Sequence, residues 1–358
     1  MKCKLCKTND LDNVGSHILT ESIIRTALNE EGYTKRENKE IIFAISSDKV
    51  GLDYFGSAVQ PEVVEKIIGK PISEELINAN DNSLIDRSLL CRECEKYFSF
   101  IESDFVEKVY SNIVRKAQNE LLNDTCNFIE YTDLKTLSLV FVLINIWRVS
   151  ATTNEDWKLT EGEEENIRSY LHNIKGKDSQ EILAKAKEHL DEINSFRFII
   201  SYFIQEAENL TENGVVIDPC VNPYFFLLNR LSIIFSFEDI TEKKLPKILP
   251  DSIKNSLGCI IEHNDAENIR ININSDSERK ELFNNYAHEV TDQIMQKLNS
   301  SFIQAHRMFL GFNPTQLSAN YYAIEMKKYV EERNGKIEIS EMLKLLAEII
   351  YKIRQSYF

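Results

Sequence analysis

Glycine and proline are scarce in this chain, which argues against a fold built from closely spaced turns. The 358 residues include only 11 glycines and 7 prolines, and the short connections of β-sandwiches and barrels depend on these residue types. Glutamate, lysine, leucine and isoleucine are abundant by comparison, and most of them favour helices. The composition therefore predicts a mainly helical protein.

Long hydrophobic runs are also missing. The longest apolar stretch, Leu137 to Trp147, is too short to cross a hydrocarbon core and is followed at once by Arg148. We expect this stretch to form a buried helix, and we expect no membrane partner. The sequence starts Met1-Lys2-Cys3-Lys4 without an apolar segment of signal-peptide length. The expected location is therefore cytoplasmic.

Positive charge is in deficit. The chain carries 42 basic and 57 acidic residues, which gives a net charge of −15. A surface of that sign repels phosphate and anionic lipid overall. Any contact with nucleic acid is therefore expected to be local, or to be supplied by a partner.

Several common catalytic motifs are absent as well. The sequence has no phosphate-binding loop with glycine and lysine, no dinucleotide-binding glycine pattern and no nucleophile elbow. His288-Glu289 lacks the second histidine that a zinc protease motif would place four residues on. These absences disfavour ATP-driven enzymes and hydrolases with a serine nucleophile.

The residue patterns divide the chain into two parts, residues 1–110 and residues 111–358. The first part holds four of the seven cysteines, and the second is dominated by long amphipathic helices. Between residues 214 and 273 the apolar pattern alternates, which predicts a small β insertion. The expected fold class is thus α+β, mainly α. The predicted helices of the second part are 134–149, 164–174, 181–206, 281–308, 319–333 and 340–355, and the predicted strands are 215–217, 259–262 and 269–273.

Two Cys-x-x-Cys pairs stand in the first part, at Cys3-Lys4-Leu5-Cys6 and at Cys91-Arg92-Glu93-Cys94. Two such pairs supply the four thiolates of a complete tetrahedral zinc site. Because such a site has no open position, we expect a structural ion that takes no part in catalysis. Two unrelated pairs of buried thiols, or a redox role for either pair, are the alternatives.

The flanks of these pairs carry a family resemblance. Ser16-His17-Ile18-Leu19-Thr20-Glu21 follows the first pair, Asp86 stands five residues before the second, and Glu95 comes directly after Cys94. In this order the segments resemble the motifs of HNH endonucleases whose ββα-metal fold is clamped by four cysteines. The resemblance implies a zinc-clamped HNH-like module in residues 1–110, followed by a helical domain that serves as a sensor, an oligomerisation module or a partner-binding module.

The resemblance also implies roles for three residues. His17 would be the general base that activates water, Glu95 would bind a catalytic Mg²⁺ or Mn²⁺ ion, and Asp86 would orient the histidine or its loop. The implied activity is hydrolysis of phosphodiester bonds in DNA or RNA, with a role in bacterial anti-phage defence. Four residues depart from the family pattern: Ser16 stands where a metal-binding side chain is common, Thr20 where proline is usual, Asp86 where asparagine is general, and Glu95 where histidine or asparagine is usual. The 84 residues between Cys6 and Cys91 are also more than the compact motif needs.

These departures keep a second function open, that of a catalytically inactive, zinc-stabilised binding or scaffold protein. Each residue also has a plainer interpretation. His17 could be an ordinary core or surface histidine, Asp86 could cap a turn, and Glu95 could be a glutamate that the helix dipole favours. The basic residues near the cysteines could contact phosphate or could simply be solvated; they are Lys2, Lys4, Lys7, Arg92 and Lys96.

Glu102 and Arg148 are the last candidates. On a helix, Glu102 lies about 10.5 Å along the axis from Glu95 on the same face, too far for the two carboxylates to share one ion. We therefore expect Glu102 either to support the metal site without binding the ion or to pair with a buried Arg148. The remaining cysteines, Cys126, Cys220 and Cys259, are expected to be small buried apolar side chains.

Overall fold

The computed structural model describes most of the chain. It covers residues 1–11, 16–20, 22–23, 40–45, 49–55, 85–86, 88–119, 128–152, 157–204, 215–218, 223–241, 244–261, 267–332 and 337–357.

Internal contacts divide the chain into two compact units. The first unit contains Met1–Ile42 and Tyr54–Leu282, and the second contains Phe43–Asp53 and Phe283–Phe358. The fold is mostly helical with mixed sheet, which confirms the α+β class. The domain boundary placed at residue 110 from the sequence stays a prediction. Within the described part of the chain, no helix is both long enough and apolar enough to span a membrane.

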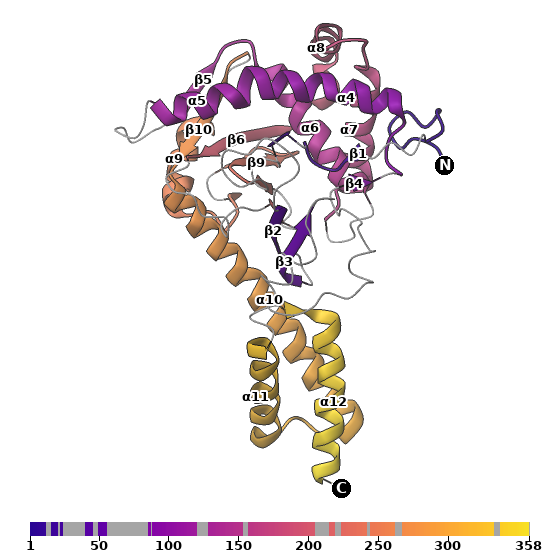
Figure 1. The fold of residues 1–358 in the computed structure, drawn as a ribbon, viewed down its shortest axis with the longest axis vertical. Coiled ribbons are helices and arrows are strands. Elements are labelled where there is room, and N and C mark those ends of the chain that lie inside the picture. The colour runs from indigo at the N-terminus through magenta and orange to yellow at the C-terminus, as the bar shows by residue number, and fades with distance from the viewer. Residues whose placement is uncertain are drawn as a thin grey trace. The chain divides into compact units, whose positions relative to one another are not determined.

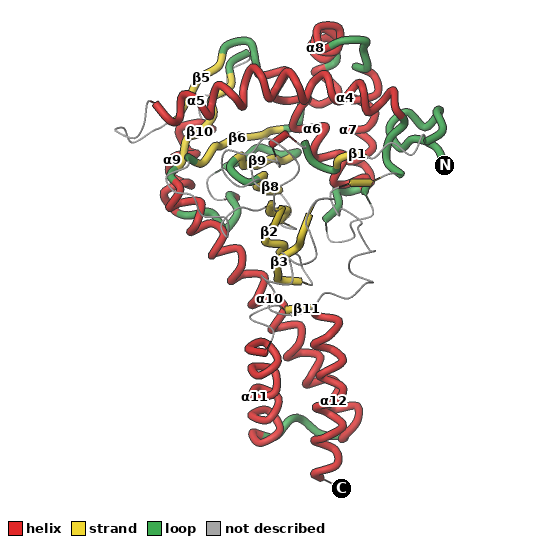
Figure 2. The backbone as a smooth tube through the Cα atoms, viewed as in Figure 1, coloured by secondary structure: helices red, strands yellow, loops and turns green. Residues whose placement is uncertain are grey.

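A six-stranded mixed sheet forms the centre of the first unit (Figure 2). β10 and β6 run parallel, and the other neighbouring strands are antiparallel. Every side chain of β8 and β9 is buried, as expected for strands covered on both faces. In sheet order the strands are β5 (Phe128–Tyr131), β10 (Ile269–Asn274), β6 (Arg197–Phe203), β9 (Leu231–Ser236), β8 (Tyr224–Leu228) and β7 (Val215–Asp218).

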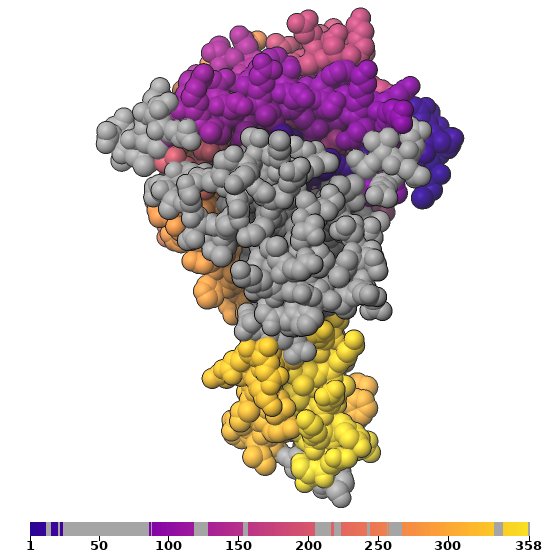
Figure 3. All heavy atoms as spheres, viewed as in Figure 1, coloured from indigo at the N-terminus to yellow at the C-terminus, as the bar shows by residue number. Residues whose placement is uncertain are grey.

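Helices supply the rest of the first unit, and α4, η1 and α5 follow one another as a single long helical run (Figure 1). The outer side of this run forms part of the molecular surface (Figure 3). The helices are α4 (Arg92–Phe105), the π-helix η1 (Val106–Tyr110), α5 (Ser111–Asn119), α6 (Lys135–Ala151), α7 (Glu161–Asn173), α8 (Ser179–Glu188), the 3₁₀ helix η2 (Leu190–Ile193) and α9 (Asp251–Ile261).

The apolar stretch that the sequence analysis singled out is the centre of α6. All its side chains from Leu137 to Ala151 are buried, which confirms the predicted buried helix. α6 packs against α4, where Phe105 stacks on Phe141 with ring centres 3.7 Å apart. Through this contact the run that follows the second cysteine pair is fixed to the core of the first unit.

Two predicted elements are wrong. The helix expected over 181–206 ends at Glu188, and β6 occupies Arg197–Phe203 instead. The strand expected at 259–262 falls largely within helix α9, whose Ile253 and Leu257 lie one turn apart and are buried. The sheet is consequently larger than the predicted insertion at 214–273, because β5 and β6 precede that range.

The second unit is formed mainly by three helices, which confirms the three helices predicted at the end of the chain. Phe302 stacks on Tyr322 with ring centres 4.3 Å apart, and His306 lies 2.8 Å from the carbonyl oxygen of Phe312. The elements are α10 (Asp276–Leu310, which begins in the first unit), α11 (Gln316–Glu332), α12 (Ile339–Tyr357) and the small sheet of β2 (Glu40–Ile45), β3 (Lys49–Phe55) and β11 (Ile337–Glu338).

A two-stranded antiparallel pair completes the part of the fold that matters for function. β1 (Ser16–His17) pairs with β4 (Ile85–Asp86), and α4 begins six residues after β4. Ser16 stands opposite Asp86 and His17 stands opposite Ile85. The HNH-like module that the resemblance implies for residues 1–110 stays a prediction.

Candidate metal and catalytic site

The four cysteines of the two Cys-x-x-Cys pairs converge. Their sulfur atoms all lie within 4.8 Å of one another and all four residues are buried. Among the residues that the structure describes, this is the one group of three or more Cys, His, Asp or Glu side chains close enough to share an ion. The group formed by Cys3, Cys6, Cys91 and Cys94 could therefore hold a metal ion such as zinc.

Backbone contacts explain why the two pairs meet. The N–H of Lys4 donates to the carbonyl of Leu89 at 3.0 Å, which joins the first pair to the segment just before α4. Lys7 adopts a left-handed conformation with φ 57° and its N–H donates to the carbonyl of Cys3 at 2.9 Å, so the chain turns tightly around the first pair. Cys91 is the N-cap residue of α4, which places Cys94 in the first helical turn.

The surroundings of the sulfur atoms suit negative charge. The side-chain amide of Asn9 donates to Cys91 Sγ at 3.6 Å, and Lys175 Nζ lies 3.8 Å from Cys94 Sγ. A hydrogen bond between Cys94 and Cys3 lowers the pKa of the Cys3 thiol and raises that of Cys94, so Cys3 is the first of the two to form a thiolate. Thiolates are the form that binds a metal, and the nearby ammonium group offsets part of the charge that four thiolates keep around a divalent ion.

Three of the basic residues near the cysteines form contacts with other residues of this chain. Lys2 pairs with Asp10 at 3.1 Å, and Lys7 pairs with Glu165 on α7 at 3.0 Å. Lys4 Nζ donates to the carbonyl of Ala151 at the end of α6. Lys7 and Lys4 thus join the cysteine-bearing loop to α7 and to the end of α6, whereas the Lys2–Asp10 pair lies within the loop itself.

The β1–β4 pair separates the polar residues of β1 onto two faces. Side chains of neighbouring strand residues point to opposite faces, so Ser16 and its partner Asp86 share one face and His17 lies on the other. Ser16 is completely buried, whereas His17 is half-buried. His17 is therefore on the more accessible side of the pair.

Asp86 caps a turn, which is the plainer of its two interpretations from the sequence. Its Oδ1 atom accepts hydrogen bonds from both the backbone N–H and the hydroxyl of Ser88, each at 2.6 Å. Its Oδ2 atom is buried and has no hydrogen-bond partner among the described residues. The Oδ1 atom thus stabilises the turn that leads into the second cysteine pair, whereas the Oδ2 atom forms no hydrogen bond with the described residues.

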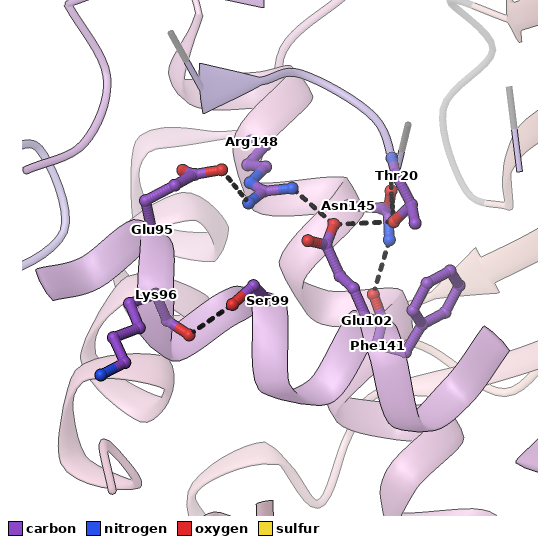
Figure 4. Close-up of polar contacts among 8 residues, drawn as sticks. All are labelled: Thr20, Glu95, Lys96, Ser99, Glu102, Phe141, Asn145 and Arg148. Carbon is purple, nitrogen blue, oxygen red and sulfur yellow. Dashed lines mark hydrogen bonds and ion pairs between the residues drawn. The ribbon is translucent and has the colours of Figure 1, made fainter. Parts of the chain in front are cut away.

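Glu95 points from α4 toward Arg148 on α6 (Figure 4). Its Oε1 atom lies 3.2 Å from Arg148 Nη2, whereas its Oε2 atom is buried without a partner among the described residues. Burial raises the pKa of Glu95, and nearby Glu102 adds to this, while Arg148 and the Ser16 hydroxyl oppose the shift. The Ser16 Oγ atom lies near this carboxyl group but forms no hydrogen bond of normal geometry.

The predicted pairing of Glu102 with Arg148 is confirmed. Arg148 Nη1 donates to Glu102 Oε1 at 2.6 Å, and only 1% of the arginine side chain is exposed. The structure adds two residues that the sequence analysis missed, Thr20 and Asn145. The Thr20 hydroxyl donates to Glu102 Oε1 at 2.8 Å and lies 3.1 Å from Asn145 Oδ1. Asn145 had one signal in the sequence, a lone amide in the apolar stretch that became α6.

Oxygen atoms without partners make this cluster suitable for a hard divalent ion. Ser16 Oγ, Asp86 Oδ2 and Glu95 Oε2 are all buried and unpaired within the described residues, and Mg²⁺ and Mn²⁺ prefer oxygen ligands. The Mg²⁺ or Mn²⁺ ion that the resemblance implies stays a prediction.

The chain has no match among models of known protein families, curated proteins or solved structures. The HNH resemblance therefore rests on the motifs of this chain and on the contacts described above.

Proposed function

We propose that the N-terminal module is a metal-dependent nuclease of the HNH type that hydrolyses phosphodiester bonds. One observation carries the proposal. The β1–β4 pair sets Ser16 opposite Asp86, the buried oxygens Ser16 Oγ, Asp86 Oδ2 and Glu95 Oε2 have no partner among the described residues, and His17 lies on the opposite, more accessible face of the pair. The order of strand, strand and helix is the one that the motifs predict.

In this proposal each residue has one task. The half-buried imidazole of His17 takes a proton from the attacking water, because neutral histidine is a base near neutral pH. Ser16, Asp86 and Glu95 would hold the Mg²⁺ or Mn²⁺ ion, which supplies charge stabilisation at the scissile phosphate. Asp86 also fixes the turn at Ser88, and the cysteines with a structural Zn²⁺ fix the base of the module.

A non-catalytic scaffold is the second candidate, and the position of Arg148 favours it. The guanidinium already occupies one oxygen of Glu95, and Lys2, Lys4 and Lys7 make internal contacts. Together with the net charge of −15, these contacts leave few cations for a nucleic-acid surface. In this case the zinc-stabilised module would present the helical domain to a partner.

The two candidates differ in one assay. The zinc-loaded full chain is incubated with supercoiled plasmid, single-stranded DNA and RNA in the presence of Mg²⁺, Mn²⁺ or EDTA, and His17→Ala is compared with the parent. The nuclease proposal expects cleavage that needs a divalent ion and falls by about 10²- to 10⁴-fold in His17→Ala, the range for loss of a general base. His172→Ala, at an exposed position of α7, is the matched control and should cleave like the parent.

Two outcomes would contradict the nuclease proposal. Equal cleavage by the parent and by His17→Ala would exclude His17 as the base. A zinc-loaded parent that cleaves none of the three substrates would favour the scaffold. The choice between DNA and RNA, the bacterial defence role, and the partner or homo-oligomer contact through the helical domain stay predictions.

A further inference from the structure

Arg148 is a buried cation held between two carboxylates of one helix face. Its two terminal nitrogens lie 3.2 Å from Glu95 and 2.6 Å from Glu102, and its guanidinium carbon lies 4.9 Å from the ring centre of Phe98. Glu95, Phe98 and Glu102 follow one another at spacings of three and four residues, so they line the same side of α4. The arginine reaches this side from α6 (Figure 4).

The two carboxylates are used differently. Glu102 Oε1 accepts hydrogen bonds from Arg148 and from the Thr20 hydroxyl, so it is tied to two separate segments. Glu95 is held through Oε1 alone, and Oε2 stays buried without a partner among the described residues. Glu102 thus anchors the guanidinium, whereas Glu95 is oriented by it and keeps one oxygen for another group.

We propose that Arg148 is a positioning residue, which fixes the Glu95 carboxylate so that Oε2 faces a divalent cation beside Ser16. This inference rests on the proposed function and adds a residue to its metal site. A guanidinium is planar and presents several N–H groups in a rigid fork, so it sets both the place and the plane of a carboxylate. Groups that orient metal ligands in this way typically contribute about 10- to 100-fold in metal affinity or activity.

A purely stabilising role would not require this arrangement. A buried ion pair adds little net stability compared with well-packed apolar side chains of similar volume, because both charges lose their hydration. An arginine used only for packing would also not leave Glu95 Oε2 and its own Nε without partners, which the described residues show. Unpaired buried polar atoms are costly, and a cation at Oε2 would remove part of that cost.

Arg148→Lys tests the inference, since lysine keeps the charge and loses the fork. Mn²⁺ is titrated into the zinc-loaded full chain, and free Mn²⁺ is followed by electron paramagnetic resonance. We expect the Mn²⁺ dissociation constant of Arg148→Lys to rise by about 10- to 100-fold. Glu102→Gln should shift it in the same direction by less, because the anchor loses its charge but keeps an oxygen acceptor.

Arg270→Lys is the matched control. Arg270 also pairs with a glutamate, Glu130 at 2.8 Å, and also lies over an aromatic ring, Phe128 at 4.7 Å. It stands on β10 and should leave the Mn²⁺ dissociation constant unchanged. Zinc content and thermal melting of each variant are measured first. If Arg148→Lys does not fold, Glu102→Gln is used in its place to test the inference.

The outcomes separate the inference from the proposed function. An Arg148→Lys variant that holds its zinc and binds Mn²⁺ as tightly as the parent would overturn the positioning role. A parent that binds no Mn²⁺ would overturn both the positioning role and the metal-dependent nuclease. A parent that binds Mn²⁺ more tightly than Arg148→Lys, yet cleaves no substrate, would uphold the positioning role while the nuclease proposal falls.

Discussion

The backbone N–H of Thr20 donates to Asn145 Oδ1 at 3.0 Å, in a place where both residues are buried. Thr20 stands where the HNH resemblance has a proline, and a proline has no N–H to donate. The departure from the family pattern therefore has a physical role in this chain. It ties the segment that follows β1 to the centre of α6.

Thr20→Pro should destabilise the protein by about 1–3 kcal/mol, the cost of leaving a buried polar group without its partner. The variant removes the Thr20 N–H that donates to Asn145 Oδ1 and the hydroxyl that donates to Glu102 Oε1. Urea unfolding followed by circular dichroism measures the change. Thr20→Ala keeps the N–H and should lose less, and a Thr20→Pro variant as stable as the parent would contradict the role given to this hydrogen bond.

Cys94→Ser should remove the structural metal and unfold the cysteine-bearing module. The parent should contain about one equivalent of zinc, since four thiolates complete a single tetrahedral site, and metal binding in such sites supplies folding free energy directly. Elemental analysis and thermal melting are the measurements. Cys259→Ser, which the sequence predicts to be no ligand, should keep its zinc. Less than half an equivalent in the parent would contradict the zinc assignment.

The cysteine group and the Glu102–Arg148 pair could be predicted from sequence for local reasons. Cys-x-x-Cys spacing places two thiols on one turn, and two pairs make a full ligand set. The helical spacing of Glu102 from Glu95 argues against a shared ion, which leaves Glu102 either as support for the metal site or as the partner of Arg148. Neither prediction depended on how distant parts of the chain pack, apart from the single contact that each one proposed.

Other features depended on contacts that no spacing rule reveals. That Arg148 would also hold Glu95, and that Thr20 would join the cluster, follows from how α4, α6 and the segment after β1 pack together. The sequence predicts helix over β6 because residues 198–203 are buried on both faces, which removes the alternation that marks a strand. The short alternating pattern at 259–262 predicts a strand where the structure has the end of helix α9. Contacts between the turns of this helix decide its structure more than the local alternation does.

Glu165 should make stability depend on pH in acid. Hydrogen bonds from Arg168 and a contact with Lys7 lower the pKa of Glu165 to about 2. Burial opposes this shift only slightly. A carboxylate whose folded pKa is depressed adds stability above its unfolded pKa and loses it as pH falls through the folded value. The parent should therefore be more stable than Glu165→Gln at pH 7.

This advantage should shrink as the pH falls from the usual range of a glutamate to about 2, the folded pKa, and vanish below it. Melting temperatures of both proteins are compared across that window. The comparison cancels protonation of the cysteines, which affects both alike. Glu188→Gln, at an exposed position of α8, should show no such pH dependence, and a difference between parent and Glu165→Gln that persists unchanged below pH 2 would contradict the assignment.

Arg148 and Glu102 should be strongly coupled in stability. Arg148→Met leaves both Glu95 and Glu102 without their cation, and breaking a buried ion pair from one side typically costs about 3–5 kcal/mol. Adding Glu102→Gln removes one of the stranded charges, so the double variant should be more stable than the sum of the two single effects predicts. A double-mutant cycle in urea should give a coupling of about 0.5–3 kcal/mol, as for residues in direct contact, and simple additivity would contradict the coupling.

The cost of Arg148→Met should also grow with pH, because Glu95 remains. Burial already raises the pKa of Glu95, and Arg148 is the main group that opposes the shift. Without the guanidinium the folded pKa rises further, and a carboxyl group with a raised folded pKa takes up a proton more readily in the folded state. Its folded form is then favoured in acid and loses stability as pH rises through the folded pKa. Arg148→Met should accordingly fall further below the parent in stability as the pH rises above the usual range of a glutamate, and Arg148→Met/Glu95→Gln, which has no charge at position 95, should lose most of that slope.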